Sequence, residues 1–335
     1  MKKQARIKQL IVCLLASCLI ISILLTGCGS VNDGKAKQVE WPQKEKVVKV
    51  IVPYGTGGGA DQVGRILSGV LEKKGIGKFV VENKVGGTGS IGLMDVMKSN
   101  PDGYTLGILP SNISIFKVAG VAPITYKDFK PVIAVNYDAC ALIVRADSEW
   151  KNFDDFKKTA SNKELNIATG SAGGIWHLGA IKLQQATGLK FNMIPMTTGG
   201  APAATTLMGK HVDGIIVAPN EAASQIKSGE FKILGIMAPE RSQNFKDVPT
   251  FKELGYDVDI RSLRGIAVPK DTPDAIVKKI HDAFKEAAND QQYLDYMKTS
   301  LSNATYMNSE EYAKYCEKEL EQYTKLMKDA GLAKN

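Results

Sequence analysis

Two glycine-rich turns contain the residues of this sequence best suited to chemistry. Gly55-Thr56-Gly57-Gly58-Gly59-Ala60-Asp61 follows a strand expected from Val47 to Pro53, and Gly87-Thr88-Gly89-Ser90-Ile91-Gly92 follows one expected from Phe79 to Glu82. A helical pattern begins after each turn, and the first has an apolar stripe of Val63, Ile66, Leu67, Val70 and Leu71. Glycine lets backbone N–H groups approach a ligand closely, and a helix N-terminus carries roughly half a positive charge. Two such turns side by side predict an anion site made of main-chain amides, without any arginine.

Two other interpretations of these turns were weighed. The first turn formally matches the dinucleotide pattern G-x-G-x-x-G/A, and Glu82 ends the next strand, where an acid could bind a ribose. A dinucleotide-binding domain needs only one such turn, and the pattern occurs here twice in a chain that we expect to be exported. The remaining alternative is that the glycines only make tight turns.

The same arrangement is expected twice more, later in the chain. Gly170-Ser171-Ala172-Gly173-Gly174 and Thr197-Thr198-Gly199-Gly200-Ala201 each lie between a strand pattern and a helix pattern, and Asn220 follows a strand that ends near Ala218. Four turns from two domains would then face one cleft, which suits the capture of a small solute by domain closure.

The N-terminus predicts export and lipid attachment. Lys2, Lys3, Arg6 and Lys8 precede an apolar run from Leu10 to Leu25, which is shorter than the ~20 residues that span a bilayer. Small residues then lead to Cys28, as in a bacterial lipobox, so we expect cleavage before Cys28 and acylation of that residue. The alternative is an ordinary secretory signal followed by a chance cysteine. An exported, lipid-anchored protein would lie in a periplasm or on a cell surface.

Charge and residue spacing argue against several functional classes. The formal net charge is +8, of which four positive charges lie in the signal, and no basic stripe suggests a nucleic-acid partner. Neither metal-ligand spacing nor a catalytic Ser, Cys or His motif is found, so we expect no enzyme, no metal and no cofactor. Cys140 and Cys316 could pair, but we expect two buried, unpaired thiols.

Alternating strand and helix patterns predict an α/β fold with two doubly wound domains joined by two crossings. The crossings are expected at Ala139–Arg145 and Ile260–Val268. The expected organisation is a signal peptide at 1–27, a lipidated tether at 28–46, domain one at 47–143 plus 265–335, and domain two at 144–264.

Two helices near the C-terminus have recognisable starts. Thr272-Pro273 predicts one helix, with Thr272 as N-cap and Pro273 as its first residue. Asn308 and Glu311 predict a capping box for another helix that runs to about Ala330 and packs on domain one.

Several longer motifs resemble the Bug family, the extracytoplasmic solute receptors of tripartite tricarboxylate transporters. The motifs are VPYGTGGGADQ, VVENKVGGTGSIG, NPDGYTL, GSAGGIWHLGA, TTGGAPAATTLMGKHVDG and VPTFKELGY, in order between about Val47 and Gly331. The resemblance implies a type II periplasmic-binding-protein fold and delivery of a carboxylated solute to a membrane permease. A receptor that signals to a sensor protein is an alternative function. An exported enzyme is a second alternative, which the sequence favours less. We expect a monomer.

The resemblance also implies a set of ligand-binding residues. They are Tyr54, Gly55, Thr56, Gly57, Gly58, Ala60, Asp61, Gly87, Thr88, Gly89, Ser90, Ser111, Asn112, Ser171, His177, Thr198, Gly199, Gly200, Ala201 and Asn220. Arg264, which does not follow the family pattern, is a further candidate. For His177, ligand contact and support of the neighbouring turn are equally open. Arg264 could bind a distal carboxylate, although pairing on the surface is favoured. Arg264 and Thr197-Thr198 depart from the usual family residues, which leaves the ligand undetermined among citrate-like acids, amino acids and aromatic acids.

Overall fold

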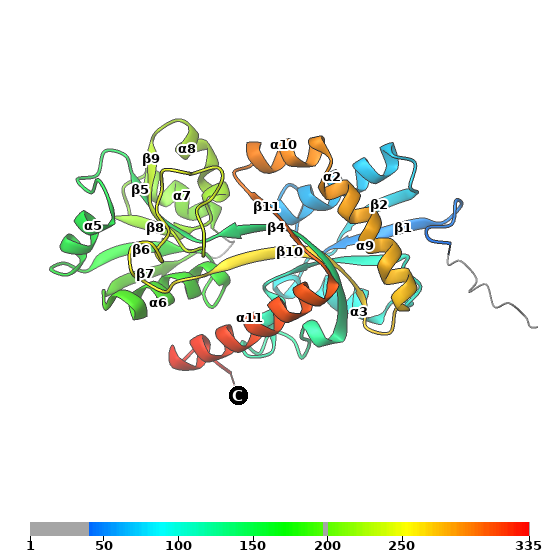
Figure 1. The fold of residues 1–335 in the computed structure, drawn as a ribbon. Coiled ribbons are helices and arrows are strands. Elements are labelled where there is room, and N and C mark those ends of the chain that lie inside the picture. Colours follow the sequence, from blue (N-terminus) through cyan, green and yellow to red (C-terminus); the bar gives the residue numbers. More distant parts are fainter. Residues whose placement is uncertain (1–39, 197–199, 335) are drawn as a thin grey trace, which may run out of the picture. The chain divides into compact units, whose positions relative to one another are not determined.

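The computed structural model describes residues 40–196 and 200–334, which form two sheets and the helices that cover them (Figure 1). None of the described helices is both long and apolar enough to cross a membrane. The expected signal and Cys28 lie outside the described residues, as do Thr198 and Gly199.

The first sheet has six strands in the order β11-β4-β10-β3-β1-β2. β1 pairs in parallel with β2 and β3, whereas β10 is antiparallel to both β3 and β4, and β11 is antiparallel to β4. The predicted parallel pairing is therefore confirmed for the first three strands only. The strands are β1 (Val47–Val52), β2 (Lys78–Asn83), β3 (Thr105–Pro110), β4 (Phe129–Ala139), β10 (Arg261–Pro269) and β11 (Asn303–Met307).

The second sheet has five strands in the order β7-β6-β8-β5-β9. β6 pairs in parallel with β7 and β8, and β5 lies antiparallel between β8 and β9. β8 ends one residue before the expected end near Ala218, and all five strands belong to this sheet. They are β5 (Ala141–Arg145), β6 (Leu165–Thr169), β7 (Phe191–Pro195), β8 (Gly214–Val217) and β9 (Phe231–Ile236).

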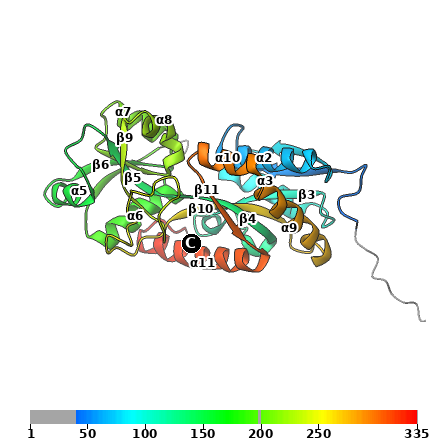
Figure 2. The same cartoon turned by 45° about the horizontal axis from the view of Figure 1, so that its top comes forward.

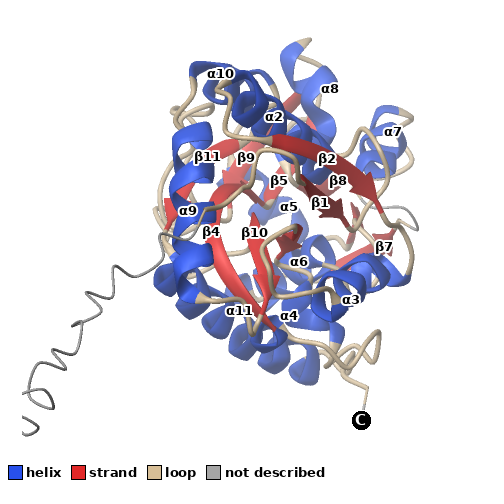
Figure 3. Cartoon of the chain, turned by 90° about the vertical axis from the view of Figure 1, so that its right-hand side faces the viewer, coloured by secondary structure: helices blue, strands red, loops and turns tan. Residues whose placement is uncertain are grey.

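Helices lie on both faces of the strands, as Figure 3 shows. The apolar stripe predicted for the first helix is buried, with Val63, Leu67, Val70 and Leu71 all in the core. The helices are α2 (Gly59–Lys73), α3 (Ser90–Lys98), α4 (Ile113–Phe116), α5 (Phe153–Ala160), α6 (Ile175–Thr187), α7 (Ala201–Met208), α8 (Ala223–Lys227), α9 (Asp274–Ala288), α10 (Gln291–Thr299) and α11 (Ser309–Asp329). Single 3₁₀ turns are η1 (Gly87–Gly89), η2 (Tyr126–Asp128) and η3 (Pro219–Ala222).

The chain passes between the two sheets at Cys140 and again at Ile260. β4 ends in the first sheet one residue before Cys140, and β5 begins in the second sheet one residue after it. The amide of Cys140 donates to the carbonyl of Ile260 at 2.9 Å, so the two passages lie side by side. Cys140 and Cys316 are both buried and free, which confirms the expectation of unpaired thiols. The boundaries of the two domains stay a prediction.

Of the two helix starts expected near the C-terminus, one needs correction and one is confirmed. The N-cap of α9 is Pro273 rather than Thr272, because the carbonyl of Pro273 accepts the first helical bonds from Ile276 and Val277 at 2.9 and 3.0 Å. The hydroxyl of Thr272 is buried without a partner among the described residues. The Asn308–Glu311 capping box of α11 is confirmed.

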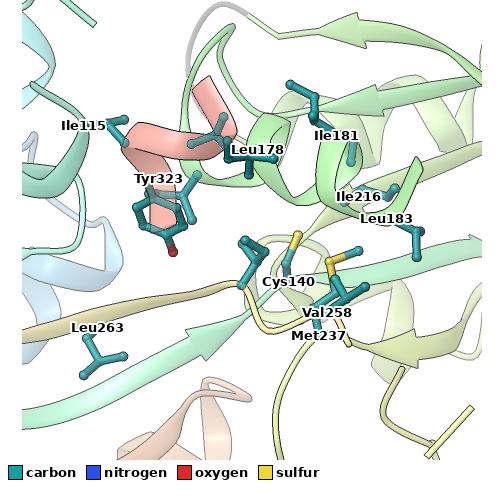
Figure 4. Packing of buried hydrophobic residues seen from close by; sticks show 14 of the residues in the cluster. Ile115, Cys140, Leu178, Ile181, Leu183, Ile216, Met237, Val258, Leu263 and Tyr323 are labelled. Carbon is teal, nitrogen blue, oxygen red and sulfur yellow. The ribbon is translucent and has the colours of Figure 1, made fainter. Parts of the chain in front are cut away.

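The long helix α11 contacts more than the first sheet. It lies beside the crossing strands in Figures 1 and 2, and its Tyr312 hydroxyl donates to the carbonyl of Leu109 at 2.7 Å. Farther along, Tyr323 packs near Leu178 of α6 and Ile115 of α4 in one buried cluster (Figure 4). The expectation that α11 packs on domain one is thus incomplete, because its C-terminal half also covers α6.

Candidate functional site

The first glycine turn ends in a helix N-terminus that has no side-chain cap. Gly58 is the N-cap of α2 and makes no side-chain cap hydrogen bond. Gly55, Gly57 and Gly58 are exposed, and a Cβ atom at Gly55 or Gly57 would meet nothing within 4 Å. Gly57 has a φ of +82°, which favours glycine. The sequence therefore leaves open space directly in front of the positive end of α2.

Asp61 holds this turn together. Its buried carboxylate accepts the amide of Gly57 at 2.9 Å, the Nε of Arg65 at 3.0 Å and the Nδ2 of Asn83 at 2.9 Å. Burial raises the pKa of Asp61, but these hydrogen bonds together lower the pKa below its usual value. With three donors from the protein itself, Asp61 is suited to positioning the turn.

The second glycine turn lies against the first. The residues of η1 have positive φ angles, +53° at Gly87, 56° at Thr88 and +102° at Gly89. A Cβ atom on Gly89 would lie 3.1 Å from the ring of Tyr54 and 3.3 Å from Pro53. Ser90, at the start of α3, is buried behind Gly87. The parallel pairing of β1 and β2 thus places the two turns side by side, because both follow the carboxyl ends of neighbouring strands.

Arg264 lies beside the first turn, which corrects two expectations. Only 12% of its side chain is exposed, and its Nη1 donates to Asp138 Oδ2 at 2.5 Å. A Cβ atom on Gly59 would lie 3.3 Å from Arg264 Nη2. Burial lowers the pKa of Arg264, but the charge of Asp138 more than compensates and raises it. The expectation that Arg264 forms a surface ion pair is therefore wrong. The expectation of an anion site without any arginine is also wrong, because Arg264 lies next to the first turn.

Asp138 was missed by the sequence analysis. Its buried carboxylate accepts hydrogen bonds from Arg264, from the Ser302 hydroxyl and from Asn220 Nδ2, the last at 2.9 Å. It thereby connects β10 and the segment before β11 to the turn after β8. A signal was present, because Asn136 and Asp138 interrupt an otherwise apolar run, and buried polar side chains need partners.

The turns of the second sheet meet at Glu221. Its carboxylate accepts the amide of Gly200 at 3.3 Å, and a Cβ atom on Gly200 would collide with it, so only glycine fits there. Burial raises the pKa of Glu221 to about 7, against the effect of a hydrogen bond from Trp176 and with the help of the charge of Asp138. Ala201, exposed at the start of α7, follows directly.

His177 supports the turn that precedes α6. The amide of Gly173 donates to His177 Nδ1 at 2.8 Å, and burial lowers the pKa of this histidine. The carbonyl of Ser171 accepts the amide of Gly174 at 2.8 Å in the same turn. Of the two roles considered for His177, turn support is thus present in the structure.

Ser111, which follows β3, is hydrogen-bonded to both α11 and β10. Its hydroxyl donates to Glu319 of α11 at 2.7 Å and accepts the amide of Leu263 in β10 at 2.8 Å. Asn112 is half-buried at the start of α4 and makes no side-chain cap bond. The hydroxyl of Ser111 is therefore engaged within the protein.

Several polar atoms near Arg264 are left without partners. Among the described residues, the Tyr54 hydroxyl, both amide atoms of Asn136 and Oδ1 of Asn220 are buried without a hydrogen bond. Burial raises the pKa of Tyr54 and the charge of Arg264 opposes this rise. Asn136 lies directly opposite Arg264 in the β4–β10 pairing, so both side chains share one face of the sheet. This part of the molecule can therefore make further hydrogen bonds.

The arrangement suits binding better than catalysis. No group of three or more His, Cys, Asp or Glu side chains in the described ranges could hold a metal ion. A hollow of about 670 Å³ is lined by residues such as Tyr137, Arg241 and Lys298, none of which is a predicted site residue. What the turns combine is an arginine, a helix N-terminus and unused polar atoms, which together favour a small anion.

The chain is similar to a known family and to several known proteins. The family model described as "Tripartite tricarboxylate transporter family receptor" matches residues 63–332. A TctC solute-binding protein from Polaromonas, solved without ligand, is 33% identical, with 87% of this chain and 100% of that chain covered and a TM-score of 0.78. Protein BugT of Bordetella pertussis is 27% identical over 85% of this chain and 89% of its own.

A third relative shares the fold at lower identity. Rpa4515 of R. palustris, solved with adipate, is 23% identical, covers 88% of this chain and 99% of its own, and has a TM-score of 0.74. The two-domain binding-protein fold expected from the sequence is confirmed by these neighbours.

Proposed function

This chain belongs to the tripartite tricarboxylate transporter receptor family, TctC, and on that premise we propose that it captures a small carboxylate anion and delivers it to a membrane permease. Proteins of this family and fold are periplasmic solute-binding receptors rather than enzymes. Membership of the family establishes solute binding. The carboxylate ligand, the delivery to a permease and the lipid anchor at Cys28 are proposed in addition.

The position of Arg264 carries the proposal. Its guanidinium lies beside Gly59, at the uncapped N-terminus of α2, and apart from Asp138 it has no hydrogen-bond partner among the described residues. A planar guanidinium binds carboxylates with two parallel hydrogen bonds, and a helix N-terminus adds amide donors and partial positive charge. The unpartnered hydroxyl of Tyr54 adds one more donor to this group.

We assign the predicted site residues to two roles. Ligand contact is proposed for the two glycine turns of the first sheet apart from Asp61, for the turn before α7, for Asn220 in η3, and for Tyr54 and Arg264. Asp61, Ser111 and His177 act by positioning the turns, because their polar atoms bind neighbouring backbone or side chains.

The proposed location follows from the family and from the N-terminal pattern. Lipid attached at Cys28 would hold the protein on the outer side of a membrane, close to its permease. The polar segment from residue 29 to 40 would serve as a tether between the lipid and the folded part. The expected tether to residue 46 is too long, because Trp41 is buried in the folded part and its indole N–H donates to the carbonyl of Gly103 at 2.8 Å.

A thermal-shift screen of organic acids tests the proposal. We expect at least one mono-, di- or tricarboxylate to raise the melting temperature of the purified protein, because a ligand at 100 times its Kd stabilises the folded state by about 2.7 kcal/mol. Choline and NAD serve as non-carboxylate comparisons. A broad acid panel without any shift, together with a shift from NAD, would contradict the proposed function.

A further inference from the structure

Asn220 presents a buried acceptor that the described residues leave unused. Its Nδ2 donates to Asp138 Oδ2 at 2.9 Å. Because a carboxylate only accepts hydrogen bonds, this contact assigns the NH₂ group to the side of Asp138 and directs Oδ1 elsewhere. Oδ1 is buried and has no donor within residues 40–196 and 200–334. A buried acceptor without a donor is unfavourable, so a donor from outside would stabilise it.

Two side chains connect this acceptor to the first glycine turn. Asp138 Oδ2 accepts from both Asn220 and Arg264, and the guanidinium of Arg264 lies against Gly59 at the start of α2. The turn after β8 is therefore joined through Asp138 to the proposed carboxylate-binding end of the site. A ligand held at α2 and Arg264 has Asn220 as a near neighbour in the second sheet.

The charged residues around Asn220 determine which ligand group can bind next to it. Asp138 binds its amide, and Glu221 is the next residue in the chain, with its carboxylate on the amide of Gly200. A second carboxylate of a ligand would lie beside these acids and has no hydrogen to donate to the free oxygen of Asn220. A hydroxyl or an ammonium group would instead donate to the free oxygen of Asn220.

We propose that this receptor prefers carboxylates that carry a hydrogen-bond donor, a hydroxyl or an ammonium group, and that Asn220 Oδ1 accepts that donor. Asp138 is the positioning residue, because it holds the amide of Asn220 and the guanidinium of Arg264 in one arrangement. The inference rests on the proposed function, since the carboxylate must bind for the donor to reach Asn220.

Matched ligands test the preference on the unaltered protein. Calorimetry would compare succinate with malate and aspartate, and acetate with glycolate and glycine, so that each set differs only in the presence of a hydroxyl or an amine. We expect a donor-bearing acid to bind about fivefold to a hundredfold more tightly than its plain partner, the range for satisfying a buried acceptor. The hydroxyl and amine arms show which donor the site accepts.

A substitution at Asn220 tests whether this residue causes the preference for acids that carry a hydroxyl or an amine. Asn220→Leu keeps the side-chain shape and removes the acceptor, so the affinities within each set should become equal. Asn192→Leu is the matched control, because Asn192 is exposed near the start of β7, at the other end of the strand from the turns, and should keep the preference.

The outcomes separate the two proposals. Equal binding of plain and donor-bearing acids by the unaltered protein, or tighter binding of the plain acids, would overturn this inference and leave the proposed function standing. Absence of binding by every carboxylate would overturn the proposed function itself. If Asn220→Leu fails to fold, as judged by circular dichroism, the ligand comparison on the unaltered protein still decides.

Discussion

At the scale of single residues, this protein combines open glycines with a buried ion pair. Gly58 has a φ of −74°, and a Cβ atom there would be 3.7 Å from the carbonyl of Gly55, an ordinary contact. A side chain at this position is therefore compatible with the fold, yet it would occupy the space in front of α2. Arg264, paired with Asp138, lies beside Gly59 at the start of this helix.

The substitution Gly58→Leu should abolish carboxylate binding and leave the fold intact. The added side chain would cover the amides at the start of α2, and a loss of more than about tenfold in affinity follows if one charge-assisted contact is lost. Calorimetry with the best acid of the screen measures the effect. Gly69→Leu is the control, because Gly69 lies on the exposed face of the same helix with nothing within 4 Å. Unchanged affinity in Gly58→Leu would remove this turn from the site.

At the scale of elements, α11 is held to the first sheet by a buried acid. Glu319 accepts the hydroxyl of Ser111 at 2.7 Å, and Ser111 in turn accepts the amide of Leu263. Burial raises the pKa of Glu319 to about 8, although hydrogen bonds from Ser111 and Tyr315 lower it in part. The helix, the turn after β3 and the crossing strand β10 thus share one titratable group.

Stability should fall as pH rises from about 5 to 9. The folded-state pKa of Glu319 is above the ordinary value of 4.5, so the folded protein binds more protons than the unfolded chain in this window, and deprotonation favours unfolding. Glu221, with a pKa of about 7, acts in the same direction. The free energy of unfolding of Glu319→Gln, measured by chemical denaturation, should fall less between pH 5 and 9 than that of the native protein. The difference should be on the order of 4 kcal/mol.

A matched variant checks that Glu319 is responsible. Glu310 is exposed on the first turn of the same helix, and a hydrogen bond from Lys314 lowers its pKa. Glu310→Gln should therefore retain the falling stability profile. Parallel pH profiles for the native protein and Glu319→Gln would show that Glu319 does not titrate in this window.

At the scale of the whole molecule, the folded part contains two sheets that the chain enters and leaves at neighbouring points. Cys140 and Ile260 are hydrogen-bonded where the two passages run side by side, and α11 packs along both the first sheet and α6. Residues far apart in the sequence, such as Asp138, Asn220 and Arg264, meet near these passages. Binding at that place would therefore involve both sheets together.

The N-terminal pattern makes a prediction about where the whole molecule resides. In a bacterial host, Cys28→Ala should shift the protein from the membrane fraction to the soluble fraction, because the acyl chains have no attachment point. Fractionation followed by immunodetection measures the shift. Cys18→Ala, within the apolar run, should leave the protein in the membrane fraction. A Cys28→Ala protein that stays in the membrane fraction would contradict lipid attachment at this residue.

Local patterns in the sequence determined much of this protein. Apolar β-branched runs predicted the strands, the stripe containing Val63 and Leu67 predicted α2, and the Asn308–Glu311 box predicted the start of α11. Glycine runs after the strands located the turns, because a strand, an open turn and a helix are encoded by adjacent residues. The antiparallel strands β4 and β11 were not predicted, and the exposed and half-buried residues of β11 give little apolar signal.

Only the tertiary structure decided which side chains surround those turns. Arg264 was expected on the surface and nothing was expected of Asp138, whereas the pairing of β10 with β4 and the position of the turn after β8 bring these side chains together. Burial and pairing of charges depend on contacts between segments more than 80 residues apart in the chain, and no local spacing encodes such contacts. The sequence thus provided the amides of the turns, and the packing of the two sheets provided the charged and polar side chains beside them.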